Sequence, residues 1–533
     1  MADDDLTSLE LKAVESPHPA YKGFLHAGNA FISYASITLV GTALGGVIAI
    51  VDEVLIARFL GVSTYGRYAL AYMLARIGSI VAAFGLPATI LHFLPLRLSQ
   101  GRREQALGSI IGGLALPVIF GGAFAVMLRL LGTWFALSVF HEPQAVIYIH
   151  NLMFLAPLIA ITEVLGHIAR GFGRALHYVL IRNLAPPLFY LWVLLYLSYS
   201  HGPKIAVTYG LVGGYIFSSL LGFVCIAKFV WSTIGVVKPQ FELREMYSYA
   251  FTVLATVAIS LGLVWTDLFQ LGIFTNANTV GIYRACMQIV FVFDVIGLTF
   301  MAAVGPIYPV LISERRDEQL RNTYLAAVHL AALLATPIFL LILVNAQDLL
   351  GILGTRFTVG ASALGILAFG SLLKVCFGTA AVLLILGGRQ RLEAVNVAVT
   401  ATLNIVLNMH LIPRFGLVGA ASSTTISLLV LSALRLLEIP RAFPAASLDL
   451  GIFRVLVTVP VAIVASRISI ICGFGPNTGV RHLMLRTFGI GLLICVTIWL
   501  VCLSEGERIA LRNLLTLRRG ARGSAGSAAS PEN

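Results

Sequence analysis

The sequence has few charged residues and no polar stretch long enough to form a separate water-soluble core. Asp, Glu, Lys and Arg make up 11% of the 533 residues, whereas hydrophobic residues make up 58%. A soluble domain contains roughly 25% charged and 45–50% apolar residues. Because the mean hydropathy is also high, at +0.92, the composition predicts an all-α integral membrane protein.

Cysteine and catalytic motifs are also scarce. The six cysteines lie in or beside apolar segments, and their spacing matches neither a disulfide framework nor a zinc site. The chain contains no P-loop, no HExxH motif and no GxSxG segment with plausible partners. We therefore expect no catalytic residues, no cofactor and no metal, which argues against an enzyme.

The net charge of +12 does not indicate a nucleic-acid partner, because the basic residues do not cluster on one stretch. Most lie in short loops at alternating ends of apolar segments. If both termini are cytoplasmic, 24 Lys and Arg lie on the cytoplasmic side, nine on the other side and three in or near spans. This asymmetry predicts that orientation. The acidic start of the chain lacks a basic signal-peptide region, so we expect a retained cytoplasmic tail.

About fourteen apolar segments are long enough to cross about 30 Å of hydrocarbon. They lie near 30–58, 66–94, 107–130, 148–169, 175–199, 206–230, 248–274, 280–311, 324–346, 361–386, 391–412, 416–438, 452–473 and 483–503.

An internal repeat divides these helices into two halves. With a shift of 215 residues, Asp52 falls on Asp267, and the same shift brings together these pairs: Phe59 and Phe274, Thr64 and Thr279, Gly66 and Gly281, Tyr68 and Tyr283, and Gly173-Arg174 and Gly388-Arg389. Two six-helix halves enter the membrane in the same orientation, which predicts a pseudo-two-fold axis along the membrane normal. A cleft between two such bundles would allow transport by alternating access.

The repeat predicts the domain organisation of the chain. We expect a cytoplasmic tail at 1–27, a six-helix bundle at 28–232, a cytoplasmic linker at 233–247, a second six-helix bundle at 248–440, two further helices at 441–505, and a basic, partly disordered cytoplasmic tail at 506–533.

Ionisable residues within the predicted spans are costly, at about 2.5–3.5 kcal/mol each, so each needs a partner or a water-filled cavity. Arg76, Arg284 and Lys374 are the candidates for contact with an anionic substrate, although Arg284 lies near the outer end of its span and can also reach the interface. Asp52, Asp267, Asp294 and Glu163 are candidate carboxylates for coupling or for structural ion pairs.

Two interpretations stay open for the carboxylates. Asp52 and Asp267, which the repeat pairs, either bind a coupling ion or form structural ion pairs, for example Asp52 with Arg76. Glu163 lies on one helical stripe with His167 and Arg170, which is typical of a salt-bridge ladder and also compatible with a proton relay.

A polar ridge lies along the eleventh span. Asn396, Thr400, Asn404 and Asn408 recur every four residues, so they share one helical face. Such a ridge either lines an aqueous cavity or makes hydrogen bonds between helices. We keep Asn396, Thr400 and Asn404 as candidate substrate-binding residues.

Several of these features together resemble a known transporter family. The segment ARFLGVSTYGRYAL contains Leu60, Gly61, Tyr65 and Gly66 directly after the first span, and the turn GGRQR with Arg389 follows the tenth. With the repeat and the 12 + 2 helices, the sequence resembles the polysaccharide-transporter branch of the multidrug/oligosaccharidyl-lipid/polysaccharide exporter superfamily, across about residues 25 to 505. The resemblance implies two pseudo-symmetric bundles plus two C-terminal helices, a MATE-like architecture.

The resemblance also implies a function. A member of this branch would be a flippase in the bacterial inner membrane that moves an undecaprenyl-pyrophosphate-linked oligosaccharide to the periplasmic leaflet, for O-antigen, capsule or exopolysaccharide assembly. Its partners would be the lipid-linked oligosaccharide, membrane lipids, and a polysaccharide polymerase with its chain-length machinery. The alternatives are a cation-coupled multidrug or metabolite antiporter of the same superfamily and, from another class, a membrane glycan polymerase or acyltransferase.

Overall fold

The computed structural model describes residues 19–200, 202–444, 464 and 480–497, and these form helices without any strand. The α-helices are α1 (Pro19–Ala83), α2 (Leu86–Ser99), α3 (Arg103–Trp134), α4 (Ala145–Leu152), α5 (Leu155–Gly171), α6 (Ala175–Tyr178), α7 (Ala185–Ser200), α8 (Pro203–Phe229), α9 (Leu243–Phe274), α10 (Ala277–Val304), α11 (Ile307–Ser313), α12 (Asp317–Val344), α13 (Ala346–Leu353), α14 (Ala361–Cys376), α15 (Gly378–Leu384), α16 (Gln390–Ala442) and α18 (Val480–Thr497). Short π-helices lie at η1 (Phe135–Val139), η2 (Val179–Leu184), η3 (Val230–Ile234) and η5 (Ile385–Arg389), and η4 (Thr355–Gly360) is a 3₁₀-helix.

Two long helices contain two predicted spans each. α1 breaks at Gly61, where φ is 70° and ψ is 167°, and α16 breaks at Gly416, where φ is 52° and ψ is −122°. Glycine adopts positive φ without the steric cost that a Cβ brings. Each break lies at the boundary between spans that hydropathy predicts, near 58–66 and 412–416.

The helices are apolar enough to cross a membrane. Eight helical segments meet this criterion among the described residues, and two of them, Ser36–Ser99 and Thr355–Ala442, are 64 and 88 residues long. At 1.5 Å per residue, such lengths exceed one crossing several-fold. The architecture is thus the predicted helical membrane fold, although the predicted span near 452–473 lies almost wholly outside the described residues.

The chain forms two compact units. Among the described residues, unit 1 contains those up to Asp52, together with Gly78–Ala125 and Phe154–Leu254; unit 2 contains Glu53–Ile77, Val126–Met153 and those from Ala255 onward. These boundaries come from contacts in space. The domain boundaries expected from the repeat stay a prediction.

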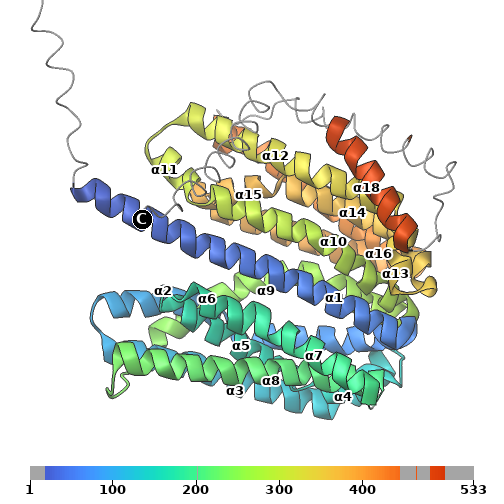
Figure 1. The fold of residues 1–533 in the computed structure, drawn as a ribbon, viewed down its shortest axis with the longest axis horizontal. Coiled ribbons are helices and arrows are strands. Elements are labelled where there is room, and N and C mark those ends of the chain that lie inside the picture. Colours follow the sequence, from blue (N-terminus) through green and yellow to red (C-terminus); the bar gives the residue numbers. More distant parts are fainter. Residues whose placement is uncertain (1–18, 201, 445–463, 465–479, 498–533) are drawn as a thin grey trace, which may run out of the picture. The chain divides into compact units, whose positions relative to one another are not determined.

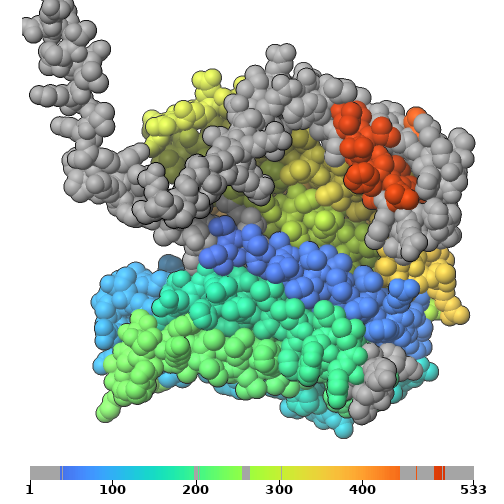
Figure 2. Space-filling model, in the orientation of Figure 1, coloured from blue at the N-terminus to red at the C-terminus, as the bar shows by residue number. Residues whose placement is uncertain are grey.

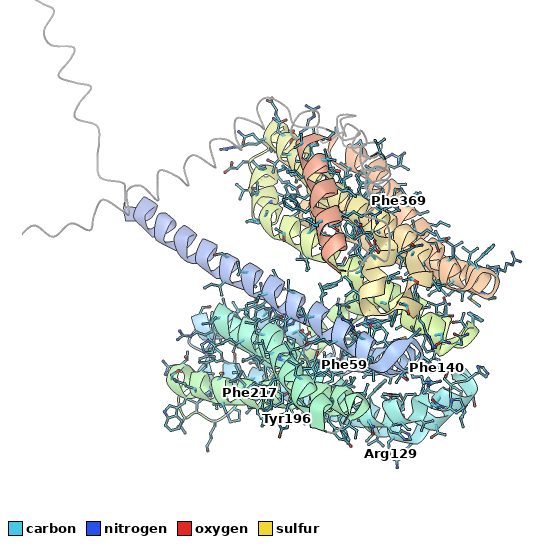
Figure 3. The ribbon with its side chains drawn as sticks, turned by 45° about the vertical axis from the view of Figure 1, so that its right-hand side comes forward. Phe59, Arg129, Phe140, Tyr196, Phe217 and Phe369 are labelled. Atoms are coloured by element: carbon cyan, nitrogen blue, oxygen red, sulfur yellow. The ribbon has the colours of Figure 1, made fainter. Side chains whose placement is uncertain are left out.

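Unit 1 is built around α5, which packs against α2 and α8, while α7 packs along α8 (Figure 1). Its core consists of aliphatic and aromatic side chains such as Leu86, Ile90 and Ile168, all fully buried. α7 and α8 also carry exposed apolar residues, among them Tyr196 and Phe217 (Figure 3). Exposed apolar surface of this kind suits contact with lipid.

Unit 2 is centred on α14, which packs against α10, α12 and α16. A hydrophobic core of this unit lies around Tyr308, Tyr324 and Leu383, where α11, α12 and α15 meet. α18, red in Figure 2, lies at the surface of this unit and contacts α12. It is the described part of the predicted last helix.

Candidate functional site

A buried carboxylate, Asp267 on α9, is the centre of a polar cluster in unit 2. Its side chain is 2% exposed. The Nδ2 of Asn408 donates to Oδ1 at 2.6 Å, the hydroxyl of Thr424 donates to Oδ2 at 2.5 Å, and the Tyr283 hydroxyl donates to Oδ2 at 2.8 Å. Three neutral donors from α10 and α16 thus surround one acidic group.

The cluster contains one acidic group and no basic partner for it among the described residues. Hydrogen bonds from neutral groups are therefore what compensates the carboxylate there. A buried ionised carboxylate without a counter-charge is strongly disfavoured. The cluster therefore has the chemistry to take a proton or a small cation.

The polar ridge of α16 supplies further oxygen atoms to this cluster. Asn396, Thr400, Asn404 and Asn408 are all buried, as the shared helical face predicts. Asn408 donates to Asn404 Oδ1 at 3.2 Å. The Oδ1 of Asn408 and the hydroxyl of Thr400 have no hydrogen-bond partner among the described residues. Hard cations prefer oxygen ligands; the α16 face offers amide and hydroxyl oxygens, and Asp267 on α9 offers the carboxylate.

The other end of the ridge lies beside a buried ion pair. Asn396 donates to Glu438 at 2.5 Å, and the buried pair of Arg435 and Glu393 lies nearby on α16, with Nη2 and Oε1 2.5 Å apart. Glu393 and Arg435 were not among the residues that the sequence singles out. Their 42-residue separation follows from the reversal at Gly416, which local periodicity does not describe.

Arg284 on α10 is enclosed in unit 2. Its guanidinium pairs with Glu53, with Nε 3.1 Å from Oε1, and Tyr65 donates to the other oxygen of that carboxylate at 3.1 Å. The guanidinium also lies over the rings of Tyr72 and Trp265, at 5.4 and 5.6 Å. Because the residue is 9% exposed, its charge is neutralised inside the protein.

Lys374 on α14 differs from Arg284 in being accessible. Its Nζ lies 2.6 Å from Oδ1 of Asp294 on α10. The side chains of Lys374 and Asp294 are 46% and 39% exposed, although both residues lie in membrane-spanning segments. An exposed ion pair in such a segment requires water around it, because lipid would not solvate it.

The remaining candidates lie elsewhere in the fold. Glu163 on α5 pairs with Arg182 on η2 at 2.5 Å, and His167 contacts the Glu163 carbonyl oxygen. Arg182 was missing from the predicted ladder. Asp52 is buried and Arg76 half-buried on α1, and both have interactions within the protein. The roles assigned to these residues stay predictions.

The described residues contain no group of three or more His, Cys, Asp or Glu side chains arranged to hold a metal ion. The Asp267 cluster has one carboxylate and several neutral oxygens, which is a different composition from a structural metal centre.

Comparison with known proteins identifies relatives of the chain. The family model described as "Polysaccharide biosynthesis protein" matches residues 33–313. A curated relative, the probable low-salt glycan biosynthesis flippase Agl15 of Haloferax volcanii, is 26% identical over 405 residues, which cover 70% of this chain and 76% of Agl15.

Solved structures show the same fold at lower identity. The lipid II flippase MurJ in an inward closed conformation aligns with a TM-score of 0.64 and 13% identity, covering 90% of this chain and 99% of MurJ. An inward-facing multidrug resistance MATE transporter of the MOP superfamily aligns with a TM-score of 0.63 and 16% identity, covering 77% of this chain and 98% of that one. These likenesses confirm the predicted MATE-like architecture.

Proposed function

Because the chain belongs to the polysaccharide biosynthesis protein family, we propose that it is a flippase for a lipid-linked oligosaccharide. The substrate is an oligosaccharide carried on undecaprenyl pyrophosphate, and it moves from the cytoplasmic to the outer leaflet of a bacterial inner membrane. Both termini are cytoplasmic. The glycan serves O-antigen, capsule or exopolysaccharide synthesis, where a polymerase with its chain-length machinery takes it up.

The structural observation that carries this proposal is the exposed pair of Lys374 and Asp294 within the membrane-spanning segments. A pyrophosphate that crosses the bilayer needs a fixed positive charge along a path bordered by low dielectric. Lys374 provides that charge, and Asp294 neutralises it when no substrate is bound. The substrate phosphate then competes with the Asp294 carboxylate for the same ammonium group.

The Asp267 cluster supplies the coupling. A proton or a sodium ion binds among Asp267, Asn408 and Thr424, where it balances the buried carboxylate. Because α9, α10 and α16 all contribute to the cluster, binding of the cation changes the stability of their packing. The cation gradient thereby drives the change between the two states of alternating access.

The experiment is a flipping assay with the purified full chain in proteoliposomes. Fluorescently tagged undecaprenyl-pyrophosphoryl chitobiose is placed in one leaflet, and its movement is followed with and without proton or sodium gradients. We expect protein-dependent movement that a gradient accelerates. Transport of a cationic drug such as ethidium, together with no movement of the sugar-bearing lipid, would contradict the proposal and favour the antiporter alternative.

A further inference from the structure

A groove of about 860 Å³ lies in unit 1, whereas Lys374 and Asp267 belong to unit 2. It is formed by the middle of α2, the segment just before α9 and the first turns of α9, with side chains that include His92, Arg244, Glu245, Ser248, Tyr249 and Thr252. Its volume lies within the range of about 300–1,000 Å³ that is usual for ligand pockets. None of these residues takes part in the proposed translocation site.

The wall of this groove is held in place by a buried arginine. Arg97, 4% exposed at the end of α2, donates to Ser109 at 2.5 Å and to Glu242 at 3.2 Å. Gln105 donates to the other oxygen of Glu242 at 2.7 Å. These contacts fix the segment before α9 to α2 and α3, so the groove is formed before a ligand binds. The role of Glu242 is to hold the wall of the groove in place.

Aromatic rings form one side of the groove. The His92 and Tyr249 rings stack with centroids 5.1 Å apart and an interplanar angle of 9°, and Phe93 meets Tyr249 edge-on at 5.7 Å. Tyr249 nevertheless remains 40% exposed. Its ring is therefore oriented by two neighbours while part of it stays available to a ligand.

The polar groups around these rings indicate the class of ligand. Glu245 and Arg244 are exposed side chains of opposite charge, and the hydroxyls of Ser248 and Thr252 lie one turn apart. Sugar hydroxyls both donate and accept hydrogen bonds, so they match a mixed set of this kind. The C–H face of a sugar ring packs on an aromatic face. A free phosphate would instead favour an excess of cations, and an apolar helix would favour an apolar lining.

We infer that this groove binds the saccharide part of the lipid-linked substrate. The inference rests on the proposed function. On the orientation expected from the loop charges, α2 ends and α9 begins at the cytoplasmic face, where the saccharide of a newly assembled substrate lies in water. The groove thus recognises the glycan before translocation, and it contributes glycan selectivity separately from the pyrophosphate contact at Lys374.

The test compares the binding of two lipids to the purified full chain in nanodiscs. The probes are undecaprenyl-pyrophosphoryl chitobiose and sugar-free undecaprenyl pyrophosphate. We expect the wild type to bind the sugar-bearing lipid more tightly. Tyr249→Ala should weaken binding of that lipid at least tenfold and leave the sugar-free lipid unchanged, and Glu245→Gln, at an exposed position, should act in the same direction. Tyr249→Phe should retain most of the preference.

The matched control is Tyr209→Ala, which removes a tyrosine that is 61% exposed in the same unit but outside the groove. It should bind both lipids like the wild type. Equal binding of the two lipids by the wild type, or a preference unaltered in Tyr249→Ala and Glu245→Gln, overturns the inference while leaving the proposed function intact. A wild type that binds neither lipid overturns both.

Discussion

Gly66 and Gly281 pack backbone against backbone within unit 2. A Cβ on Gly66 would overlap the carbonyl oxygen of Ala277, and a Cβ on Gly281 would overlap the carbonyl oxygen of Val62. The 215-residue shift converts Val62 to Ala277 and Gly66 to Gly281, so the two contacts are equivalent. Such reciprocity is the signature of a two-fold relationship. The internal repeat thus appears within unit 2 as two equivalent close approaches of backbone.

Replacing either glycine by alanine should loosen this contact. Gly66→Ala and Gly281→Ala each force backbone atoms apart, with an expected loss of about 1–3 kcal/mol. Thermal unfolding of the purified variants measures the effect. Because both substitutions disturb the same pair of backbones, the double variant should lose less than the sum of the two single losses.

Gly122→Ala is the matched control for this experiment. Gly122 lies in the interior of α3, and a Cβ there meets nothing within 4 Å. The Gly122→Ala variant should therefore show only the gain in helix propensity, which raises the free energy of unfolding by about 1 kcal/mol at most. If all three variants unfolded at the same temperature, the close approach would have no energetic importance.

The contact between Gly66 and Gly281 is an example of a feature that sequence patterns can predict. The repeat alone pairs Gly66 with Gly281, and the breaks at Gly61 and Gly416 fall where hydropathy separates successive spans. Both kinds of information are local or periodic along the chain. They define helices, their ends and the relationship between the halves.

The buried pair of Glu53 and Arg284 provides a second prediction. Glu53→Gln leaves the guanidinium buried without a counter-charge, which should cost about 3–5 kcal/mol. The double variant Glu53→Gln with Arg284→Met removes both charges, and it should recover much of the lost stability because methionine fits between aromatic rings. The apparent melting temperature in detergent is the measurement.

The exposed pair of Glu314 and Arg316 serves as the comparison for this prediction. Their side chains are 45% and 54% exposed, so Glu314→Gln should change stability by about 0–1 kcal/mol. Equal effects of Glu53→Gln and Glu314→Gln would mean that burial of Arg284 has no consequence for the fold.

Side-chain partners are much harder to predict than helices. Glu53 is 231 residues from Arg284, and Asp267 is 157 residues from Thr424. No helical period connects such positions, because their proximity depends on how separate helices pack. The sequence identifies Asp267 as costly in a membrane, yet it does not identify Thr424, whose only signal is a run of small hydroxyl residues within an apolar span.

Asp267→Asn should separate coupling from folding. The amide keeps the size of the side chain but removes the buried negative charge, so we expect stability equal to or above that of the wild type. Flipping of the sugar-bearing lipid should lose its acceleration by the cation gradient, while slow exchange without a gradient continues. The measurement is the initial rate in proteoliposomes with and without the gradient.

Thermal unfolding identifies the cation in the same variant. A cation that binds only the folded protein raises its stability with concentration. If the cation is sodium, NaCl should stabilise the wild type more than choline chloride does, and Asp267→Asn should lose this difference. Full gradient dependence in Asp267→Asn would exclude a coupling role for the cluster.

Substitutions of Lys374 and Asp294 should affect flipping differently if Lys374 contacts the substrate, and equally if the two residues form only a structural ion pair. If Lys374 binds the pyrophosphate, Lys374→Gln should lower flipping at least tenfold, whereas Asp294→Asn should retain it because the competing carboxylate is removed. Arg76→Ala should lower flipping in the same way as Lys374→Gln if Arg76 also contacts the substrate.

The relative effects of the two substitutions on flipping separate a substrate contact from a structural ion pair. Lys374 and Asp294 are both exposed, so either substitution should change the free energy of unfolding by about 1 kcal/mol or less. A structural pair would instead make Lys374→Gln and Asp294→Asn equally harmful to flipping, because each breaks the same contact. The ratio of flipping rates between these two variants, measured at equal protein content in the vesicles, therefore decides whether Lys374 holds the substrate or only its neighbour on α10.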